Sequence, residues 1–408
     1  MRIDTSLNRD DIAPAMQWVA TKFGGALDKR VKGFEQQRAK NPLLQSYYRE
    51  TYPIEYALAE SRRHYRLTGR FPFGSNFGRA YALVAALQRF AELLNPSALA
   101  QLDGRIRGAM KDEFGLRPLA YEVDTAVNLV RRGFDVEWTD LTGVASFDLR
   151  ATKDATTIEI ECKTTSADTG RKITRAGLHR LAGRLADRTR LIDRTGGVHL
   201  YQVTIPNRLD TNDAQIAALA ELISKSMDHA RDERSPSGRV IYRLLDSVAP
   251  SLSSEAEIRN YLEARSVREN CHIVWNERPG HGLIAMAVMS EEADTVAASV
   301  TARAMEAAKQ LSGRNPAIVT LQLVEMSRAQ LEILLKTPNT LHAAARRVFN
   351  RAAHIDSITY SVPIGSESIN SHISAELSAP ALVLYNPAPR FPCSLAREAF
   401  GKNVPSES

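Results

Sequence analysis

The sequence is poor in cysteine and in long apolar runs. Only three cysteines occur among 408 residues (Cys162, Cys271 and Cys393), so we expect no disulfide framework and a reducing compartment. The longest unbroken apolar run, at 283–289, is far too short to cross a bilayer, and residues 1–4 lack the basic and then apolar order of a secretory signal. We therefore expect a cytoplasmic protein that does not associate with membranes.

Several motifs that mark common enzyme classes are also missing. The chain has no Gly-x-Ser-x-Gly elbow, no Gly-Lys-Ser/Thr phosphate loop and no Gly-x-Gly-x-x-Gly dinucleotide loop. Cys271 and His272 with His281 lack the paired spacing of a zinc site. The composition, 44% hydrophobic and 25% charged, excludes a disordered chain and leaves room for two or three domains.

The apolar periodicity divides the chain into three expected regions. Residues 1–112 show apolar spacings of three and four, which predict a mostly helical region, and they are rich in basic and aromatic residues. Residues 113–210 predict a helix, three strands, a basic helix and a strand, which is a compact α/β core. Residues 211–408 alternate strand and helix patterns, which predict a further α/β domain of no evident chemistry.

The middle region contains a predicted hairpin with two acidic side chains at opposed positions. In the run 158–163, apolar residues alternate with Glu159, Glu161 and Lys163, so these three share one face. A two-residue turn at 154–155 would place Asp148 directly across from Glu161. Carboxylates about 5 Å apart repel each other when both are ionised, which favours a bound cation.

Hard divalent cations such as Mg²⁺ prefer carboxylate and carbonyl oxygens. The predicted ligands are Asp148, Glu161 and the backbone carbonyl of Cys162, with Glu122 from the preceding helix as a further ligand and Mn²⁺ as a second candidate ion. Lys163 would lie beside a water molecule or a phosphate, where it could orient the water, take its proton or neutralise developing charge.

A basic segment follows the hairpin. Residues 171–194 contain eight Lys or Arg and two Asp, a local charge of +6 that favours a polyanionic partner. Arg171, Lys172 and Arg175 are the predicted phosphate contacts. The alternative is that these charges form the solvated face of a surface helix.

Asp148 followed by Glu161-Cys162-Lys163 resembles the signature of the PD-(D/E)xK, or restriction-endonuclease-like, nucleases, over roughly residues 116–206. The resemblance implies Mg²⁺-dependent hydrolysis of DNA phosphodiester bonds, by an endonuclease of restriction, phage defence or repair. It also implies that Asp148 and Glu161 bind the metal while Lys163 acts at the attacking water. Phe147 stands where the family has proline, and no Gln-x-x-x-Tyr follows Lys163, which disfavours the exonuclease-like branch.

Several alternatives stay open at this point. The acidic face of the hairpin could simply face solvent, and Glu159 could replace or assist Glu161 in a real site. The chain could keep the fold and bind nucleic acid without cleaving it, or it could cleave RNA instead of DNA. Formation of a homo-oligomer is also compatible with the sequence.

Overall fold

The chain forms two compact units in the computed structural model. Unit 1 comprises residues 1–32, 51–166 and 297–408, and unit 2 comprises residues 33–50 and 167–296. The structure describes the following residues: 8–40, 48, 51–191, 196–209, 212–246, 255–266, 271–278, 282–324, 326, 331, 334, 341–362 and 382–400. Among them, no helix combines the length and the apolar character needed to span a membrane.

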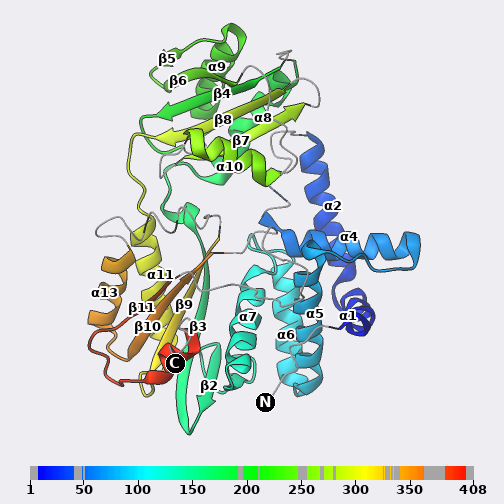
Figure 1. The fold of residues 1–408 in the computed structure, drawn as a ribbon, viewed down its shortest axis with the longest axis vertical. Helices are drawn as coiled ribbons and strands as arrows, with labels where there is room; N and C mark the ends of the chain where they lie inside the picture. Colours follow the sequence, from blue (N-terminus) through cyan, green and yellow to red (C-terminus); the bar gives the residue numbers. More distant parts are fainter. Residues whose placement is uncertain are drawn as a thin grey trace, which may run out of the picture. The chain divides into compact units, whose positions relative to one another are not determined.

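Unit 1 is built on a six-stranded mixed sheet in the order β1-β2-β3-β9-β10-β11. Figure 1 shows α7 on one side of this sheet and α11 with α13 on the other. The strands are β1 (Asp135–Trp138), β2 (Leu149–Lys153), β3 (Thr156–Ser166), β9 (Ala317–Val324), β10 (Ile355–Ser361) and β11 (Leu382–Tyr385). The helices are α1 (Arg9–Lys22), α4 (Pro53–Thr68), α5 (Ser75–Leu93), α6 (Pro96–Ala109), α7 (Arg117–Arg131), α11 (Val296–Gln310), α13 (Leu341–Arg351) and α14 (Ser394–Phe400), while α2 (Gly24–Lys40) contributes to both units.

The N-terminal helices share one hydrophobic core with the sheet. Apolar side chains of α1, α4, α5 and α6 pack in the same cluster as those of α7 and of β1 to β3; examples are Leu83, Leu102, Leu119 and Ile160. This core therefore extends across the boundary that we expected near residue 112. Amphipathic helices need an apolar partner, and here that partner is the helix α7 and the sheet that follow in the chain.

The strand that completes the sheet beside β3 is β9. We expected Val198–Ile205 in this place, but that strand, β4, belongs to the sheet of unit 2. Strand β9 runs parallel to β3, with Glu161 opposite Val319 and Lys163 opposite Leu321. The order helix, three strands, helix, strand thus occurs as α7, β1, β2, β3, α11 and β9, with residues 167–296 inserted before its second half.

Unit 2 contains a five-stranded mixed sheet in the order β5-β6-β4-β8-β7. Its strands are β4 (Val198–Ile205), β5 (Glu233–Ser235), β6 (Gly238–Asp246), β7 (His272–Arg278) and β8 (Gly282–Ser290). Its helices are the expected basic helix α8 (Arg175–Leu191), α9 (Asp213–His229) and α10 (Glu255–Ser266), after a short 3₁₀ turn η2 (Ala167–Gly170). The expected domain 211–408 is therefore divided, because its first part builds unit 2 and its second part completes the sheet of unit 1.

Candidate metal centre

The β2–β3 hairpin has the register that the sequence predicted. Leu149 pairs with Ile160 and Lys153 pairs with Thr156, so the two-residue turn consists of Asp154 and Ala155. Both turn residues have positive φ, 50° and 62°, as a turn that follows the right-handed twist of a hairpin requires. This register brings Asp148 beside the end of β3 that carries Glu161.

The two faces of β3 are both covered. Ile158, Ile160 and Cys162 join the core shared with α7, as their alternation predicted. On the other face Glu159 and Glu161 are 1% and 0% exposed, so a solvent-facing acidic strand is excluded. Glu159 accepts hydrogen bonds from the backbone N–H of Ser312 and the amide of Asn315, both at 2.8 Å. Its carboxylate is thus hydrogen-bonded to the loop after α11 and lies outside the group of acids around Asp148.

Asp148 is held by the edge of β3. The backbone N–H of Cys162 donates to its Oδ2 at 2.7 Å, and the backbone N–H of Asp148 donates to Oε2 of Glu161 at 3.1 Å. The backbone N–H of Thr139 donates to the carbonyl of Asp148 at 3.0 Å. These three hydrogen bonds set the orientation of Asp148, which is 8% exposed.

Three buried or half-buried carboxylates converge at this point. Glu122 of α7, Asp140 of the loop after β1 and Asp148 each offer an oxygen, and these oxygens lie within 4.8 Å of one another. Glu161 is outside this group of three. For Cys162 the contact with the group runs through its N–H, where we had expected its carbonyl.

Arg105 of α6 forms ion pairs with two of these acids. Its guanidinium donates to Asp140 at 2.9 Å and also contacts Glu122. The Arg105 side chain is 29% exposed, whereas that of Glu122 is 6% exposed. One guanidinium thus partly neutralises two of the three carboxylates from the more open side of the cluster.

Burial and crowding raise the pKa values of these acids. Burial, reinforced by Asp148 and Asp140, raises the pKa of Glu122 to about 8 even though Arg105 lowers it. Burial raises the pKa of Asp148 to about 6, and Asp140 adds to the effect. Burial also raises the pKa of Asp140, although Arg105 opposes that shift. The cluster therefore carries less negative charge than its count of carboxylates suggests.

Glu161 and Lys163 form an ion pair beside Asp148. The ammonium of Lys163 lies 2.5 Å from Oε1 of Glu161, and the Lys163 side chain is 23% exposed. Burial and the nearby Asp148 raise the pKa of Glu161 to about 8, against the attraction of Lys163. Burial also opposes the charge of Lys163, but Glu161 outweighs it and raises the pKa of the amine. Lys163 is therefore a protonated group at neutral pH.

The donor set fits a hard divalent cation. Oxygens about 2.1 Å from an octahedral Mg²⁺ lie roughly 3–4 Å apart, so oxygens within 4.8 Å need only small shifts to share one ion. Glu122 is only 4% exposed, and its buried Oε2 has no hydrogen-bond partner among the described residues. A buried carboxylate oxygen without a partner is costly, and a bound cation would remove that cost.

The residues predicted to contact phosphates belong to unit 2. Arg171 is 6% exposed and its guanidinium lies 3.3 Å from Nε2 of His272, so its burial speaks against a phosphate contact. Lys172 pairs with Glu292, and the backbone N–H of Arg175 donates to Asp168. The structure thus gives each of these residues a contact within unit 2.

Asp140 and Arg105 are the two members of the cluster that sequence reasoning missed. Asp140 had a usable signal, because an acid two residues after the strand 135–138 lies at the same end of the hairpin as Asp148. Arg105 had none, since it precedes Glu122 by 17 residues on a separate helix and looks like any surface arginine.

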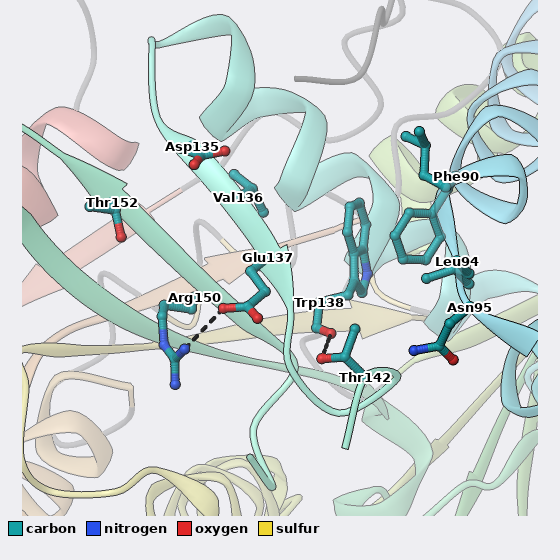
Figure 2. A pocket seen from close by; sticks show the side chains of 11 residues that line it. Phe90, Leu94, Asn95, Asp135, Val136, Glu137, Trp138, Thr142, Arg150 and Thr152 are labelled. Carbon is teal, nitrogen blue, oxygen red and sulfur yellow. Dashed lines mark hydrogen bonds and ion pairs between the residues drawn. The ribbon is translucent and has the colours of Figure 1, made fainter. Parts of the chain in front are cut away.

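A separate cleft of about 440 Å³ lies at the β1 edge of the sheet. Figure 2 shows the ion pair of Glu137 with Arg150, at 2.9 Å, on one side of it and Phe90 with Trp138 on another. Glu122, Asp140 and Asp148 do not line this cleft. The one arginine that lines it, Arg150, is thus already paired with an acid.

Comparisons with protein-family models, with curated proteins and with solved structures gave no match.

Proposed function

We propose that this chain is a metal-dependent nuclease that hydrolyses phosphodiester bonds of DNA, with the acidic cluster as its active site. The observation that carries the proposal is the convergence of Glu122, Asp140 and Asp148 beside a protonated Lys163, with one carboxylate oxygen of Glu122 buried and unpartnered. Buried acids with raised pKa values next to a lysine are typical of catalytic sites.

The topology supports the same proposal. The sequence resembles the PD-(D/E)xK nucleases, whose core order is a helix, three strands, a helix and a strand. In this chain α7, β1, β2, β3, α11 and β9 follow that order, and β9 lies parallel to β3. The acids and Lys163 lie on α7, β3 and the loops that flank β1 and β2. This order of elements supports the proposal independently of the short motif.

In this proposal Glu122, Asp140 and Asp148 hold Mg²⁺, or Mn²⁺ in its place. Such an ion supplies charge for the phosphate oxygens and acidifies a water molecule. Asp148 is suited to the task because two contacts with β3 hold it in one orientation. Glu161 contacts Lys163 and the backbone N–H of Asp148. We therefore assign Glu161 a positioning role in place of the metal-ligand role that we expected from the sequence.

Two cations are placed to act on the substrate. Lys163, partly exposed and paired with Glu161, can stabilise negative charge that develops on the phosphate or orient the attacking water. Arg105 can turn from the acids to a phosphate oxygen, because its side chain is the more exposed partner in its pair with Glu122. Guanidinium groups match phosphate geometry with two parallel hydrogen bonds.

A second candidate is a nucleic-acid-binding protein that does not cleave. Arg105 favours this alternative, because its contacts with Glu122 and Asp140 supply part of the charge that a metal would otherwise provide. Such a protein would bind nucleic acid equally well with and without Mg²⁺. A third outcome is cleavage of RNA by the same site.

The test is cleavage by the purified protein of supercoiled plasmid, linear duplex, single-stranded DNA and RNA, in Mg²⁺, Mn²⁺ or EDTA. Glu122→Gln should abolish cleavage and weaken Mn²⁺ binding measured by titration calorimetry. Asp124→Asn is the matched control, since Asp124 is equally buried on α7 but pairs with Arg79 outside the cluster. It should cleave and bind Mn²⁺ like the wild type.

Absence of cleavage of every substrate together with retained binding would favour the non-cleaving alternative. Cleavage confined to RNA would keep the site and change the substrate class. If Glu122→Gln binds Mn²⁺ as tightly as Asp124→Asn, the acidic cluster is not the metal centre.

A further inference from the structure

The two faces of the unit 2 sheet are covered to different extents. Helices α8 and α9 pack against one face, where Tyr201, Val203 and Val240 are buried. Helix α10 packs against the other face through Ile258 and Leu262, mainly over strands β4, β7 and β8. Strands β5 and β6 form the rest of this second face. Of their residues, only Leu245, near the end of β6, packs against the apolar cluster under α10.

Three arginines lie on this second face. Arg234 of β5 is directly opposite Arg239 of β6, and Arg243 follows on the same face four residues later. The register extends the face to β4, where Arg239 pairs with Thr204 and Arg243 pairs with Leu200. All three arginines are exposed, while Thr204 is half-buried. We call Arg234, Arg239 and Arg243 the arginine face.

The side chains of the arginine face are not paired with acids among the described residues. None of its three side chains forms an ion pair or a hydrogen bond there, although nearby Arg231 pairs with Glu233. Asp232 lies just before β5, but its Oδ1 accepts the backbone N–H of Tyr242 at 3.0 Å. Like charges at directly opposed positions destabilise a sheet, so an external anion would stabilise this arrangement.

We infer that the arginine face binds the phosphate backbone of a nucleic acid. Opposed side chains begin about 5 Å apart, and four residues of strand span about 13 Å, so the three cations cover the distance of several phosphates along one strand. The positions between them on the same face are held by Gln202, Thr204 and Ile241, which carry no negative charge that would repel a phosphate.

This inference deepens the proposed function by naming where its substrate is held, but it does not depend on cleavage. The arginine face belongs to unit 2 and the acidic cluster to unit 1. Binding measured in EDTA tests the first, and cleavage in Mg²⁺ tests the second. Either can fail while the other stands.

The test is binding of a fluorescent 30-base-pair DNA to the full chain in EDTA, by anisotropy, over a range of salt concentrations. In the variant Arg234→Gln/Arg239→Gln/Arg243→Gln, affinity should fall at least about tenfold at 0.1 M salt. The slope of log K against log salt should fall by about 2–3, since each lost phosphate contact lowers it by roughly 0.9. Arg239→Gln alone should lower the slope by about 1.

The matched control is Arg180→Gln/Arg184→Gln/Arg188→Gln on α8. These arginines are equally exposed, but they face Asp213 and Asp228 of α9. The control should keep most of the wild-type slope. Equal losses in the two triple variants, or no loss in the first with its circular dichroism unchanged, would overturn the inference. So would displacement of DNA by poly-L-glutamate at equal charge concentration, because it would indicate an acidic protein partner.

Discussion

The backbone N–H of Asp148 donates to the side chain of Glu161 at 3.1 Å, so the two acids are joined by a hydrogen bond and not only opposed by charge. The side chain of Asp148 in turn accepts the N–H of Cys162, the next residue after Glu161. This exchange explains how the chain holds two carboxylates together at the edge of β3. Because the side chain of Asp148 is both a charge and a hydrogen-bond acceptor, two substitutions at this position can measure the two effects separately.

Asp148→Asn should stabilise the metal-free protein at pH 8 by about 1–2 kcal/mol, because it removes a crowded buried charge. The amide oxygen can still accept the N–H of Cys162. Asp148→Ala should lack this gain, since it leaves that N–H unpaired at a cost of about 1–3 kcal/mol. Urea denaturation in EDTA measures both. Equal stabilities of the two variants would contradict the role of the Cys162 hydrogen bond.

Lys163→Ala should still bind Mn²⁺ while its cleavage rate falls by a factor on the order of 10²–10⁴, as expected for a lost acid–base or charge-stabilising group. Lys153→Ala is the control on the same hairpin, because Lys153 pairs with Glu398 away from the cluster. Single-turnover rates on plasmid DNA compare the two. Cleavage at the wild-type rate by Lys163→Ala would remove Lys163 from the mechanism.

Arg105→Ala should destabilise the metal-free protein at pH 8, because Glu122 and Asp140 lose their common partner. Saturating Mg²⁺ should restore more of the melting temperature in this variant than it adds to the wild type. Arg79→Ala breaks the comparable pair with Asp124 and should not be rescued by Mg²⁺. An equal response of both variants to Mg²⁺ would show that Arg105 and the ion do not share a site.

The raised pKa values of Glu122 and Glu161, each about 8, predict the direction of a pH effect. Their protons favour the folded state, so this contribution to stability is present below about pH 4.5 and is lost as pH rises through 8. Mg²⁺ binding needs the ionised form of its ligand Glu122 and should therefore raise the melting temperature more at pH 8 than at pH 6.

The control for this pH effect is Glu122→Gln, because Asp124 also has a pKa raised by burial, to about 7, and changes stability in the same direction. Differential scanning calorimetry at pH 6 and pH 8, with and without Mg²⁺, should show a smaller loss of stability with pH in Glu122→Gln than in the wild type. An identical loss would assign the pH effect to groups outside the cluster.

Local rules were sufficient for the hairpin and insufficient for its surroundings. Period-two alternation and a two-residue turn predicted the register of β2 with β3, and with it the proximity of Asp148 to Glu161. The choice of β9 over β4 as the neighbour of β3 could not be predicted in the same way. Both are mostly apolar strands of eight residues, and which of them pairs with β3 depends on contacts far along the chain. Arg105 escaped prediction for the same reason.

The insertion of residues 167–296 between β3 and α11 affects how the protein emerges from the ribosome. Strand β3 can pair with β2 as soon as the hairpin is made, but its other edge must wait for β9, which ends at Val324. At a synthesis rate of about 5–20 residues per second, this delay lasts on the order of ten seconds. Throughout that interval β3, the strand that carries Glu161 and Lys163, presents unpaired N–H and C=O groups along one edge, where another chain can pair and start aggregation.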